Sequence, residues 1–471
     1  MLNIKNLEKA DGLTERDAEY LRELVSVLKK NYSKHEKRHR YYEDKVPVRS
    51  HGMKVPYEYL TNNYATGWAA KAVNVLAERS VFDGFTFEEG APAGFEEVMR
   101  ENDIRGLYAM SVPSMLIEGV GFWTVSRGGQ NEPDVIVNYH NAMTSAGIWD
   151  YRHKRLRACL VIADYARLDK RSDVPSVCVL YTDQANVVID RYKSDEWIAT
   201  YYPHKMGVPM AVPMVYKQSD GKPFGKSRIT PAVMGCVDRA MRELLNTDMQ
   251  SDYFSIPMKY VLGASNEQFE ALGANIHDAY KTEMLVMTSN DEGGNPTVGM
   301  LQPADMTPHI AALDKWASMI ASETCVPASM FGVQDKVYTS SDALRAAVDE
   351  LVILCKDMNK ANAHALSLVA QMVVAVMANE GLAELDYNAR TVTVHFEDPA
   401  MPSDSANADA MIKVVSAVPE FAGSEVFWEK LGYSEDDRKR IMGAQGSQAA
   451  QRMVEALLTG ATDEDTAAGA R

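Results

Sequence analysis

Two histidines and a glutamate near the N-terminus have the spacing of a known catalytic motif. The run His35-Glu36-Lys37-Arg38-His39 matches H-E-x-x-H, in which two histidines one helical turn apart hold a zinc ion. In peptidases of this type, the glutamate activates a water molecule bound to the metal. The spacing alone therefore raises the hypothesis that the chain is a zinc metallopeptidase.

The residues around this motif oppose the binding of a metal. Lys37 and Arg38 fill its two variable positions, Lys34 precedes it and Arg40 follows it, so cations would surround a divalent ion. A third ligand is also needed, and Glu58, at a conceivable distance along the chain, has no helical glutamate motif around it. We therefore expect no metal and no catalysis here. The motif would then be a solvated helix end or a basic patch that meets an acidic neighbour.

Other motifs for catalysis or cofactor binding are weaker still. The chain has no G-x-S-x-G and no G-x-G-x-x-G, and its "FGKS" at 224–227 lacks the upstream glycine of a phosphate loop. His140 and His204 have no spaced partner, so we expect both to be structural. The five scattered cysteines favour buried thiols over disulfides or a zinc knuckle. We expect no enzyme activity, no cofactor and no metal.

The composition is that of an ordinary soluble globular protein with two or more structural regions. Of the 471 residues, 46% are hydrophobic and 24% are charged. We expect no membrane span, because no run of 18 strongly apolar residues occurs, and no secretory signal, because the N-terminal "MLNIKNLEKADG" lacks an apolar core. The formal net charge of -16 argues against tight, sequence-independent binding of nucleic acid by the surface as a whole.

Helices are expected in the N-terminal part, followed by strands. A helix over 13–45, with apolar residues at helical spacing, precedes further helices over 67–80 and 92–120, the last broken at Pro113. The segment 122–216 consists of strand-like runs separated by turn residues, which predicts an antiparallel meander.

A threonine followed by a proline marks a helix start at position 230 and again at position 307. The threonine oxygen caps the helix, and the proline needs no donor in the first turn. Between the two helices we expect a strand at "KYVLGA", residues 259–264, and a hairpin around 288–299.

A long helix is expected over 342–380, roughly 60 Å at 1.5 Å per residue. Its apolar residues recur at steps of three and four, with a gap at Asn362. This pattern fits either a packing seam against partner helices or a single helix that crosses a large core. A strand near 391–399, two further helical segments and a polar tail complete the chain.

Four passages, in this order, resemble the portal proteins of tailed bacteriophages, specifically the Gp6-like group common in phages with long flexible tails. The passage "GWAAKAVNVLAERSVFDGF" resembles the early helix of that family and the turn after it. The passage "FGKSRITPAVMGCVDRAMRELLNTDMQSDYFSIPMKYVLGA" resembles the family's stem helix where it enters the clip. The passages "CVPASMFGVQ" and "YTSSDALRAAVDELV" resemble the family's tunnel loop and the long helix beyond it. The passage "VHFEDPAMPSDSANADAMIKVV" resembles the start of the family's crown. The resemblance spans roughly residues 40–445.

The resemblance implies an α+β portal fold with an α/β wing, a two-helix stem, a small α/β clip, a long kinked helix and a helical crown. It divides the chain into a wing (1–225), a stem helix (226–252), a clip (253–306), a second stem helix (307–326), a tunnel loop (327–341), a long wing helix with a strand (342–398), a crown (399–460) and a disordered tail (461–471).

The resemblance also implies a function. Portal proteins form a homo-oligomeric ring, usually a dodecamer, at one vertex of the capsid. Double-stranded DNA is packaged and ejected through the ring, which docks the terminase and the head-tail adaptor and contacts the major capsid and scaffolding proteins. The chain would reside in the virion, and in the host cytoplasm during assembly, with no membrane partner. The zinc peptidase and another head assembly protein remain alternatives.

Two groups of site residues follow from the resemblance. The tunnel loop would face the DNA with Val333, Gln334, Asp335, Lys336, Val337 and Tyr338. The charges of the one acid and the one base in this loop nearly cancel, which suits weak, non-specific contact with DNA. The clip would dock its partners through Asp291, Glu292, Asn295 and Pro296.

Overall fold

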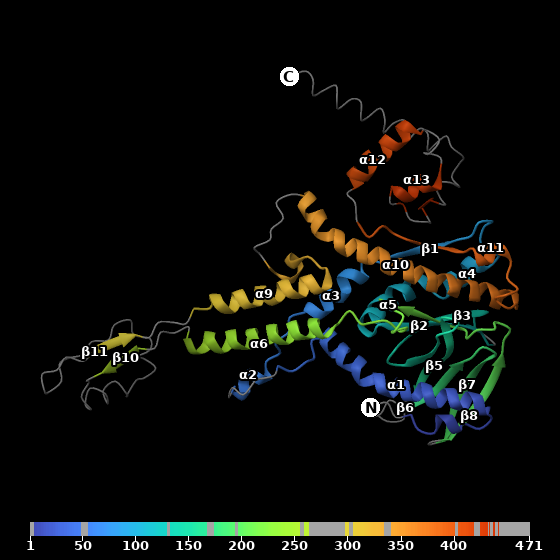
Figure 1. Cartoon of the computed structure of the whole chain (residues 1–471), viewed down its shortest axis with the longest axis horizontal. Coiled ribbons are helices and arrows are strands. Elements are labelled where there is room, and N and C mark those ends of the chain that lie inside the picture. Colours follow the sequence, from blue (N-terminus) through green and yellow to red (C-terminus); the bar gives the residue numbers. More distant parts are fainter. Residues whose placement is uncertain are drawn as a thin grey trace. The chain divides into compact units, whose positions relative to one another are not determined.

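The chain divides into two compact units, which are described separately (Figure 1). The structure is a computed structural model and describes residues 4–48, 55–129, 132–166, 174–193, 196–254, 259–262, 297–300, 305–333, 341–400, 404–418, 424–431, 433, 437–438 and 441. Unit 1 comprises Met1–Lys45, Gly67–Met234 and Ala321–Arg471, and unit 2 comprises Val46–Thr66 and Gly235–Ile320.

An antiparallel five-stranded sheet, covered on one face by the first long helix, forms one layer of unit 1. Its order is β4 (Ser145–Asp150), β5 (Arg155–Ala166), β6 (Val174–Tyr181), β7 (Ala185–Lys193) and β8 (Glu196–Pro203). Helix α1 (Glu15–Tyr42) buries Leu21, Leu24 and Leu28 against this sheet, where they meet residues such as Leu180 and Val187. The predicted first helix and the antiparallel meander are both confirmed.

A second, three-stranded sheet holds the largest fully buried side chain among the described residues of unit 1. Its order is β3 (Val135–Asn141), β2 (Val120–Arg127) and β9 (Ala211–Val215), and Trp123 of β2 is 0% exposed. The free edge of β3 is covered by Asn102, whose side chain accepts from the amide of Val137 (2.8 Å) and donates to the carbonyl of Val135 (3.0 Å). An amide side chain thus takes the place of a neighbouring strand and blocks edge pairing.

The helix predicted over 92–120 is two helices, and the predicted break at Pro113 is wrong. Helix α4 (Phe95–Glu101) ends before Asn102, and α5 (Ile104–Glu118) contains Pro113 in its interior. The chain breaks at Asp103, which has a positive φ of 44° and whose carboxylate accepts from the amide of Gly106. The cap formed by this aspartate decides where the second helix begins.

Helix α10 (Ser341–Ala378) confirms the predicted long helix and is a core helix of unit 1. It contacts β2, β3 and β9 as well as β12 (Thr393–Phe396) and α11 (Tyr387–Arg390). Its residues Leu351, Cys355 and Val369 are buried, so the alternative of a single helix crossing a core holds. By length and composition the stretch Ala346–Ala378 could also cross a membrane, but a core helix passes the same test, and 56% of the most apolar window is buried.

The gap in the apolar pattern of α10 is a buried polar network. Asn362, 0% exposed, donates from Nδ2 to the hydroxyl of Tyr108 on α5 (2.9 Å). Ser80 lies 2.7 Å from the same hydroxyl and donates to Oδ1 of Asn359 (2.6 Å). Polar residues in the middle of the helix therefore join α10 to α5 through hydrogen bonds in the core.

The remaining elements of unit 1 surround α10. Helix α3 (Trp68–Ala77) confirms the helix predicted over 67–80, and β1 (Phe82–Thr86) pairs antiparallel with β12. The C-terminal part contributes α12 (Asp404–Ala417) and α13 (Glu425–Lys430). A buried ion pair of 3.0 Å between Arg438 and Asp83 ties this part to β1.

Unit 2 contains two long helices that lie side by side. Most of α6 (Pro231–Phe254) and α9 (Thr307–Thr324) belongs to it, with the short helix α2 (Tyr57–Thr61). His309 of α9 lies 2.8 Å from Glu243 of α6, and the guanidinium of Arg239 lies over the ring of Trp316 at 5.1 Å. The pair is therefore joined by polar and cation–π contacts.

The two-stranded sheet of unit 2 confirms the strand expected after α6. Strand β10 (Lys259–Leu262) pairs antiparallel with β11 (Thr297–Met300). Most of the hairpin predicted around 288–299 lies outside the described residues.

The two threonine–proline helix starts differ in their caps. Thr230 accepts from the amide of Val233 (3.3 Å), as predicted for α6. At α9 the oxygen comes from Asp305, which accepts from the amide of Thr307 (2.9 Å), so the predicted threonine cap at 307 is wrong. The carboxylate also accepts from the threonine hydroxyl (2.6 Å), which keeps that oxygen away from the helix amides.

Candidate functional site

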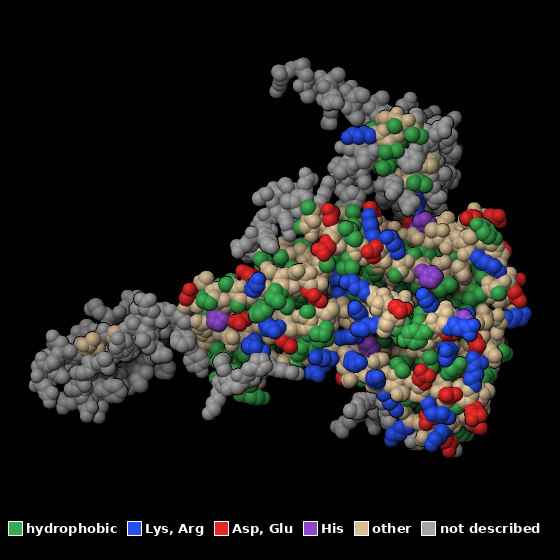
Figure 2. All heavy atoms as spheres, in the orientation of Figure 1, with side chains coloured by type: hydrophobic (Ala, Val, Ile, Leu, Met, Phe, Trp, Pro, Cys, Tyr) green, Lys and Arg blue, Asp and Glu red, His purple; other side chains and the backbone are tan. Residues whose placement is uncertain are grey.

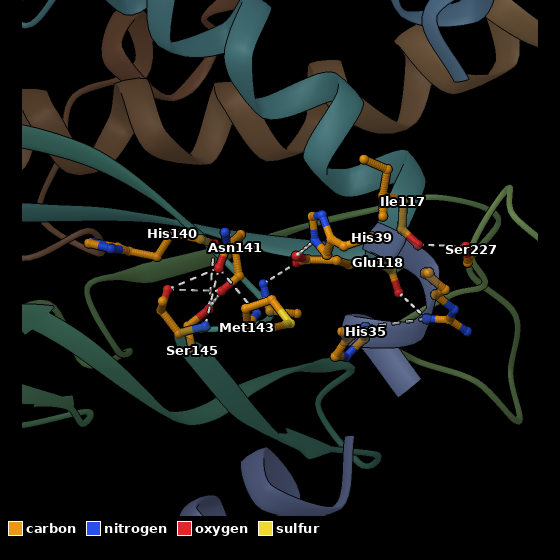
Figure 3. A network of polar contacts seen from close by, with 12 residues as sticks. His35, His39, Ile117, Glu118, His140, Asn141, Met143, Ser145 and Ser227 are labelled. Atoms are coloured by element: carbon orange, nitrogen blue, oxygen red, sulfur yellow. Dashed lines mark hydrogen bonds and ion pairs between the residues drawn. The ribbon is translucent and has the colours of Figure 1, made fainter. Parts of the chain in front are cut away.

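The H-E-x-x-H motif lies at the C-terminal end of α1 and contacts protein groups. Nε2 of His39 lies 2.7 Å from Oε1 of Glu118, and Nδ1 of His35 lies 3.3 Å from Nη1 of Arg38 (Figure 3). Glu36 is exposed, whereas His35 is buried. Among the described residues, no group of three or more His, Cys, Asp or Glu side chains could hold a metal ion. The geometry does not support a zinc peptidase.

Glu118, the last residue of α5, is the acidic neighbour of this basic helix end. Its side chain is 0% exposed, and Oε2 accepts a hydrogen bond from the amide of Ala142. Its main-chain carbonyl accepts from Nη1 of Arg38 at 2.7 Å. The expectation of a basic patch that meets an acidic neighbour therefore holds for Arg38 and His39, whereas Glu36, Lys37 and Arg40 are exposed, as the alternative of a solvated helix end predicted.

Burial changes the proton affinities in this cluster. Burial raises the pKa of Glu118, and the hydrogen bond and charge of His39 oppose the shift. Burial, reinforced by the charges of Arg38, His39 and Lys34, lowers the pKa of His35 to about 4. His35 is therefore neutral at pH 7, and since a guanidinium only donates, Nδ1 accepts from Arg38.

The two histidines predicted to be structural are half-buried in the strand region. Burial lowers the pKa of His140 to about 4, and Figure 3 shows this residue beside the loop that holds Asn141 and Ser145. Nδ1 of His204 accepts from the amide of Met206 at 3.3 Å. Both therefore lie in packed surroundings, as the sequence predicted.

Arg228 joins the start of α6 to the end of α9 within unit 1. The residue is 5% exposed, and its guanidinium donates to three groups. They are the carbonyl of Ala72 on α3, the hydroxyl of Tyr216 (3.1 Å) and the carbonyl of Thr324 (2.6 Å). Thr230 adds a hydrogen bond of 2.9 Å to Oε1 of Glu323. These contacts hold the start of α6 and the C-terminal end of α9 in place within unit 1.

The segment after α9 leads from this anchor toward the predicted tunnel loop. The short 3-10 helix η2 (Ala328–Phe331) packs Phe331 edge-on against Trp68, with ring centroids 6.2 Å apart. Gly332 follows with a φ of 94°, a conformation that glycine adopts without strain. Val333 comes next and is buried, 7% exposed.

The other site residues predicted from the resemblance lie outside the described residues. They are Gln334, Asp335, Lys336, Val337 and Tyr338 of the tunnel loop, and Asp291, Glu292, Asn295 and Pro296 of the clip.

Sequence reasoning missed Glu118 as the partner of His39 and treated Arg228 only as part of a polar helix face. His39 and Glu118 are 79 positions apart, so no local pattern pairs them. For Arg228, a cation directly before a threonine–proline helix start is a weak signal, since most such residues are solvated.

Comparisons with known proteins find similarity to phage portal proteins. The family model described as "Phage portal protein, SPP1 Gp6-like" matches residues 22–451. The chain is 23% identical to "Portal protein" of Mycobacterium phage L5 over 416 residues, covering 85% of this chain and 82% of that protein. It is 22% identical over 454 residues to "Portal protein" of Mycobacterium phage D29, covering 92% and 88% respectively.

Among solved structures, the chain is similar to one described as "Neck of native GTA particle computed with C12 symmetry". The identity is 12% and the TM-score 0.44, and the match covers 81% of this chain and 90% of the other. A chain of "Virion of native gene transfer agent (GTA) particle" matches with 11% identity and a TM-score of 0.44, covering 87% and 99%.

Proposed function

The chain belongs to the phage portal proteins of the SPP1 Gp6-like family, and on that premise we propose that it forms a closed ring at one vertex of a phage capsid. DNA passes through the ring during packaging and again during ejection. The observation that carries this proposal is the extent of the family match, which runs from α1 through both units to the C-terminal helices. The protein acts as a conduit and a docking platform, and we assign it no reaction of its own.

The two units suit the parts of such a ring. The side-by-side helices α6 and α9 support the role of a stem, and the β10–β11 sheet between them in the chain supports a clip. The two sheets of unit 1 and the core helix α10 would form the wing. Helices α12 and α13 would begin the crown. In this assignment Arg228 and Thr230 anchor both stem helices to the wing.

The DNA-facing surface would come from the loop that follows Val333. Because Val333 is itself buried in the single chain, Gln334, Asp335, Lys336, Val337 and Tyr338 are the stronger candidates for DNA contact. A formal charge of -16 per chain suits the passage of DNA through the ring, because a strongly basic channel would bind the DNA phosphates and hold them in place.

The clip would dock the terminase during packaging and the head-tail adaptor afterwards, through Asp291, Glu292, Asn295 and Pro296. Deleting residues 291–296 should impair docking of both partners while the ring still forms. Docking that survives the deletion would remove these residues from the site. Contacts with the major capsid and scaffolding proteins would fall on the wing, during assembly in the host cytoplasm and then in the virion.

Electron microscopy of the purified chain tests the function directly. We expect closed rings with a central hole, with twelve subunits as the usual number for portal proteins. A chain that stays monomeric at every concentration, or that forms particles without a hole, would overturn the proposal. The second outcome would favour another head assembly protein.

A further inference from the structure

Helix α1 exposes a row of cations on the side opposite its buried apolar residues. Lys30, Lys34 and Lys37 follow each other at steps of four and three, with Arg40 one step further, and all four are exposed. Like charges at this spacing destabilise a helix. The helix dipole favours cations only in the last turn, which accounts for Arg40 but not for the lysines. Lys37 also lies over the ring of Tyr41 at 5.8 Å, but local helix stability does not explain Lys30 or Lys34.

Among the residues that the structure describes, the cationic face has no acidic partner. No ion pair within the part of the chain that the structure describes involves Lys30, Lys34, Lys37 or Arg40. The end of the helix is nevertheless held firmly, because Arg38 and His39 bind Glu118 beneath it. The cations are thus carried on a fixed support rather than on a fraying helix end.

A second surface of unit 1 carries exposed acids. Glu88 and Glu89 follow β1, and Glu97 and Glu101 lie on α4; all four are exposed. Figure 2 shows acidic side chains gathered at the upper right, where Figure 1 places β1, α4 and α11. The loop at this acidic surface is held by Asn388 of α11, which accepts from the amide of Glu89 (2.9 Å) and donates to the carbonyl of Gly90 (3.0 Å).

Local structure accounts for Glu97, which lies in the first turn of α4, but not for the other three acids. Glu101 is the last residue of α4, where the helix dipole opposes a carboxylate. None of the ion pairs between described residues involves Glu88, Glu89, Glu97 or Glu101. The acidic surface therefore also carries charges that form no ion pair with any described residue.

The two surfaces lie at opposite ends of α5. This helix begins beside α4 and ends at Glu118, which binds His39 of α1. Its 15 residues span roughly 22 Å. In Figure 1, α1 lies at the lower side of unit 1, whereas β1 and α4 lie toward the upper right, beside α11. One subunit thus carries a cationic and an anionic surface on separate sides.

We propose that the cationic face of α1 docks against the acidic surface at β1 and α4 of the next copy in the ring. A closed ring requires two different, complementary surfaces on each subunit, because each contact joins one side of a copy to the other side of its neighbour. Copies with a charge of -16 repel one another, and an exposed cationic face offsets that repulsion where they meet. This inference rests on the ring of the proposed function and names one of its contacts.

Three full-length variants, compared with the wild type by mass photometry and electron microscopy, test the contact. One carries K30E, K34E and K37E, one carries E88K, E89K and E101K, and the third combines all six changes. We expect each triple variant to lose at least nine-tenths of its rings at about 0.1 M salt, and the combined variant to form rings again. Rings of the wild type should weaken as salt rises, because exposed charges are screened.

A matched control carries R152E, R155E and R157E, the same change of charge at exposed positions of the β4–β5 hairpin. It should form rings like the wild type, and circular dichroism should show that every variant is folded. Any of three results would overturn the contact: rings that survive both triple changes, a combined variant that is folded but not rescued, or a control that fails equally.

Two other results separate this inference from the proposed function. Wild-type rings with unaffected triple variants would overturn the contact and leave the portal function standing. A wild type that never forms rings would overturn both. If K30E, K34E and K37E left the rings intact but lowered DNA retention in filled particles, the cationic face would instead contact DNA phosphates, and the docking between copies would be wrong.

Discussion

His39 and Glu118 form an ion pair between α1 and α5, with Nε2 and Oε1 2.7 Å apart and the carboxylate side chain fully buried. The histidine is 28% exposed, so the pair lies at the edge of the core with its acid on the inside. Two residues of an apparent zinc motif thus owe their positions to packing, since the same helix end also supplies Arg38 to the carbonyl of Glu118.

Replacing His39 by alanine should destabilise the chain by about 1–3 kcal/mol, because the buried carboxyl group of Glu118 loses a hydrogen-bond partner. Adding Glu118→Gln should recover part of this loss, since a neutral amide is cheaper to bury than a charge. The measurement is the free energy of unfolding in urea. His153→Ala is the matched control, because His153 forms an exposed pair of 2.7 Å with Asp150 and should be removable without a measurable change. Equal effects of the two alanine changes would contradict the prediction.

Stability should fall between about pH 6.5 and pH 4, in part because of His35. Burial lowers its pKa from the usual 6.5 to about 4 in the folded chain, so the unfolded chain binds the proton more readily in this window. The contribution is fully present above pH 6.5 and is lost, by up to about 3 kcal/mol, as the pH falls to 4. Glu118 acts in the opposite direction, because burial raises its pKa.

His35→Gln should therefore flatten the pH profile of the unfolding free energy, although His140 keeps a similar contribution. Urea unfolding at a series of pH values measures the profile. His153→Gln, at an exposed position, should leave it unchanged. A His35→Gln profile identical to that of the wild type would show that His35 is not buried in solution.

Arg228→Met should cost about 3–5 kcal/mol, because it leaves the buried carbonyls of Ala72 and Thr324 without their donor. Tyr216→Phe removes only one of the three hydrogen bonds and should cost about 1 kcal/mol. Arg228→Lys should fall between the two, since one ammonium group cannot reach three acceptors in different directions. Unfolding in urea gives the order, and a Met variant as stable as Tyr216→Phe would refute the anchoring role.

Trp123→Ala should cost about 3–5 kcal/mol, as expected for a large aromatic side chain that is fully buried. The exposed Tyr151 provides the control, and Tyr151→Ala should change the unfolding free energy by less than about 0.5 kcal/mol. A small effect of the tryptophan change would mean that β2 does not belong to the core.

Asp335→Lys should reduce DNA packaging and leave ring assembly unaffected, because it adds one positive charge per copy around a single circumference. Packaged DNA per particle is the measurement, with electron microscopy of the rings as its companion. Asp335→Asn is the control that removes the acid without adding a cation. Unchanged packaging in the lysine variant would remove this loop from the DNA-contacting surface.

Element types followed from the sequence where the pattern was long and regular. The apolar spacing of α1 and α10 and the alternation in the strands report which face of each element is buried, so these elements were predicted with nearly correct bounds. The break between α4 and α5 was misplaced, because Pro113 is an obvious signal, whereas the capping role of Asp103 depends on its backbone conformation. Local signals of similar strength compete, and only the folded chain shows which one prevails.

The sequence by itself determined the run of helices and strands, the acidic charge and, through four ordered passages, the family. The tertiary structure decided which distant residues meet: His39 with Glu118, Asn362 with Tyr108, and Arg228 with Thr324. No local pattern encodes these pairs, because each depends on the packing of elements separated by 79 to 254 residues. An exposed cation and a buried anchor look alike in a sequence, and burial alone distinguishes Lys37 from Arg228.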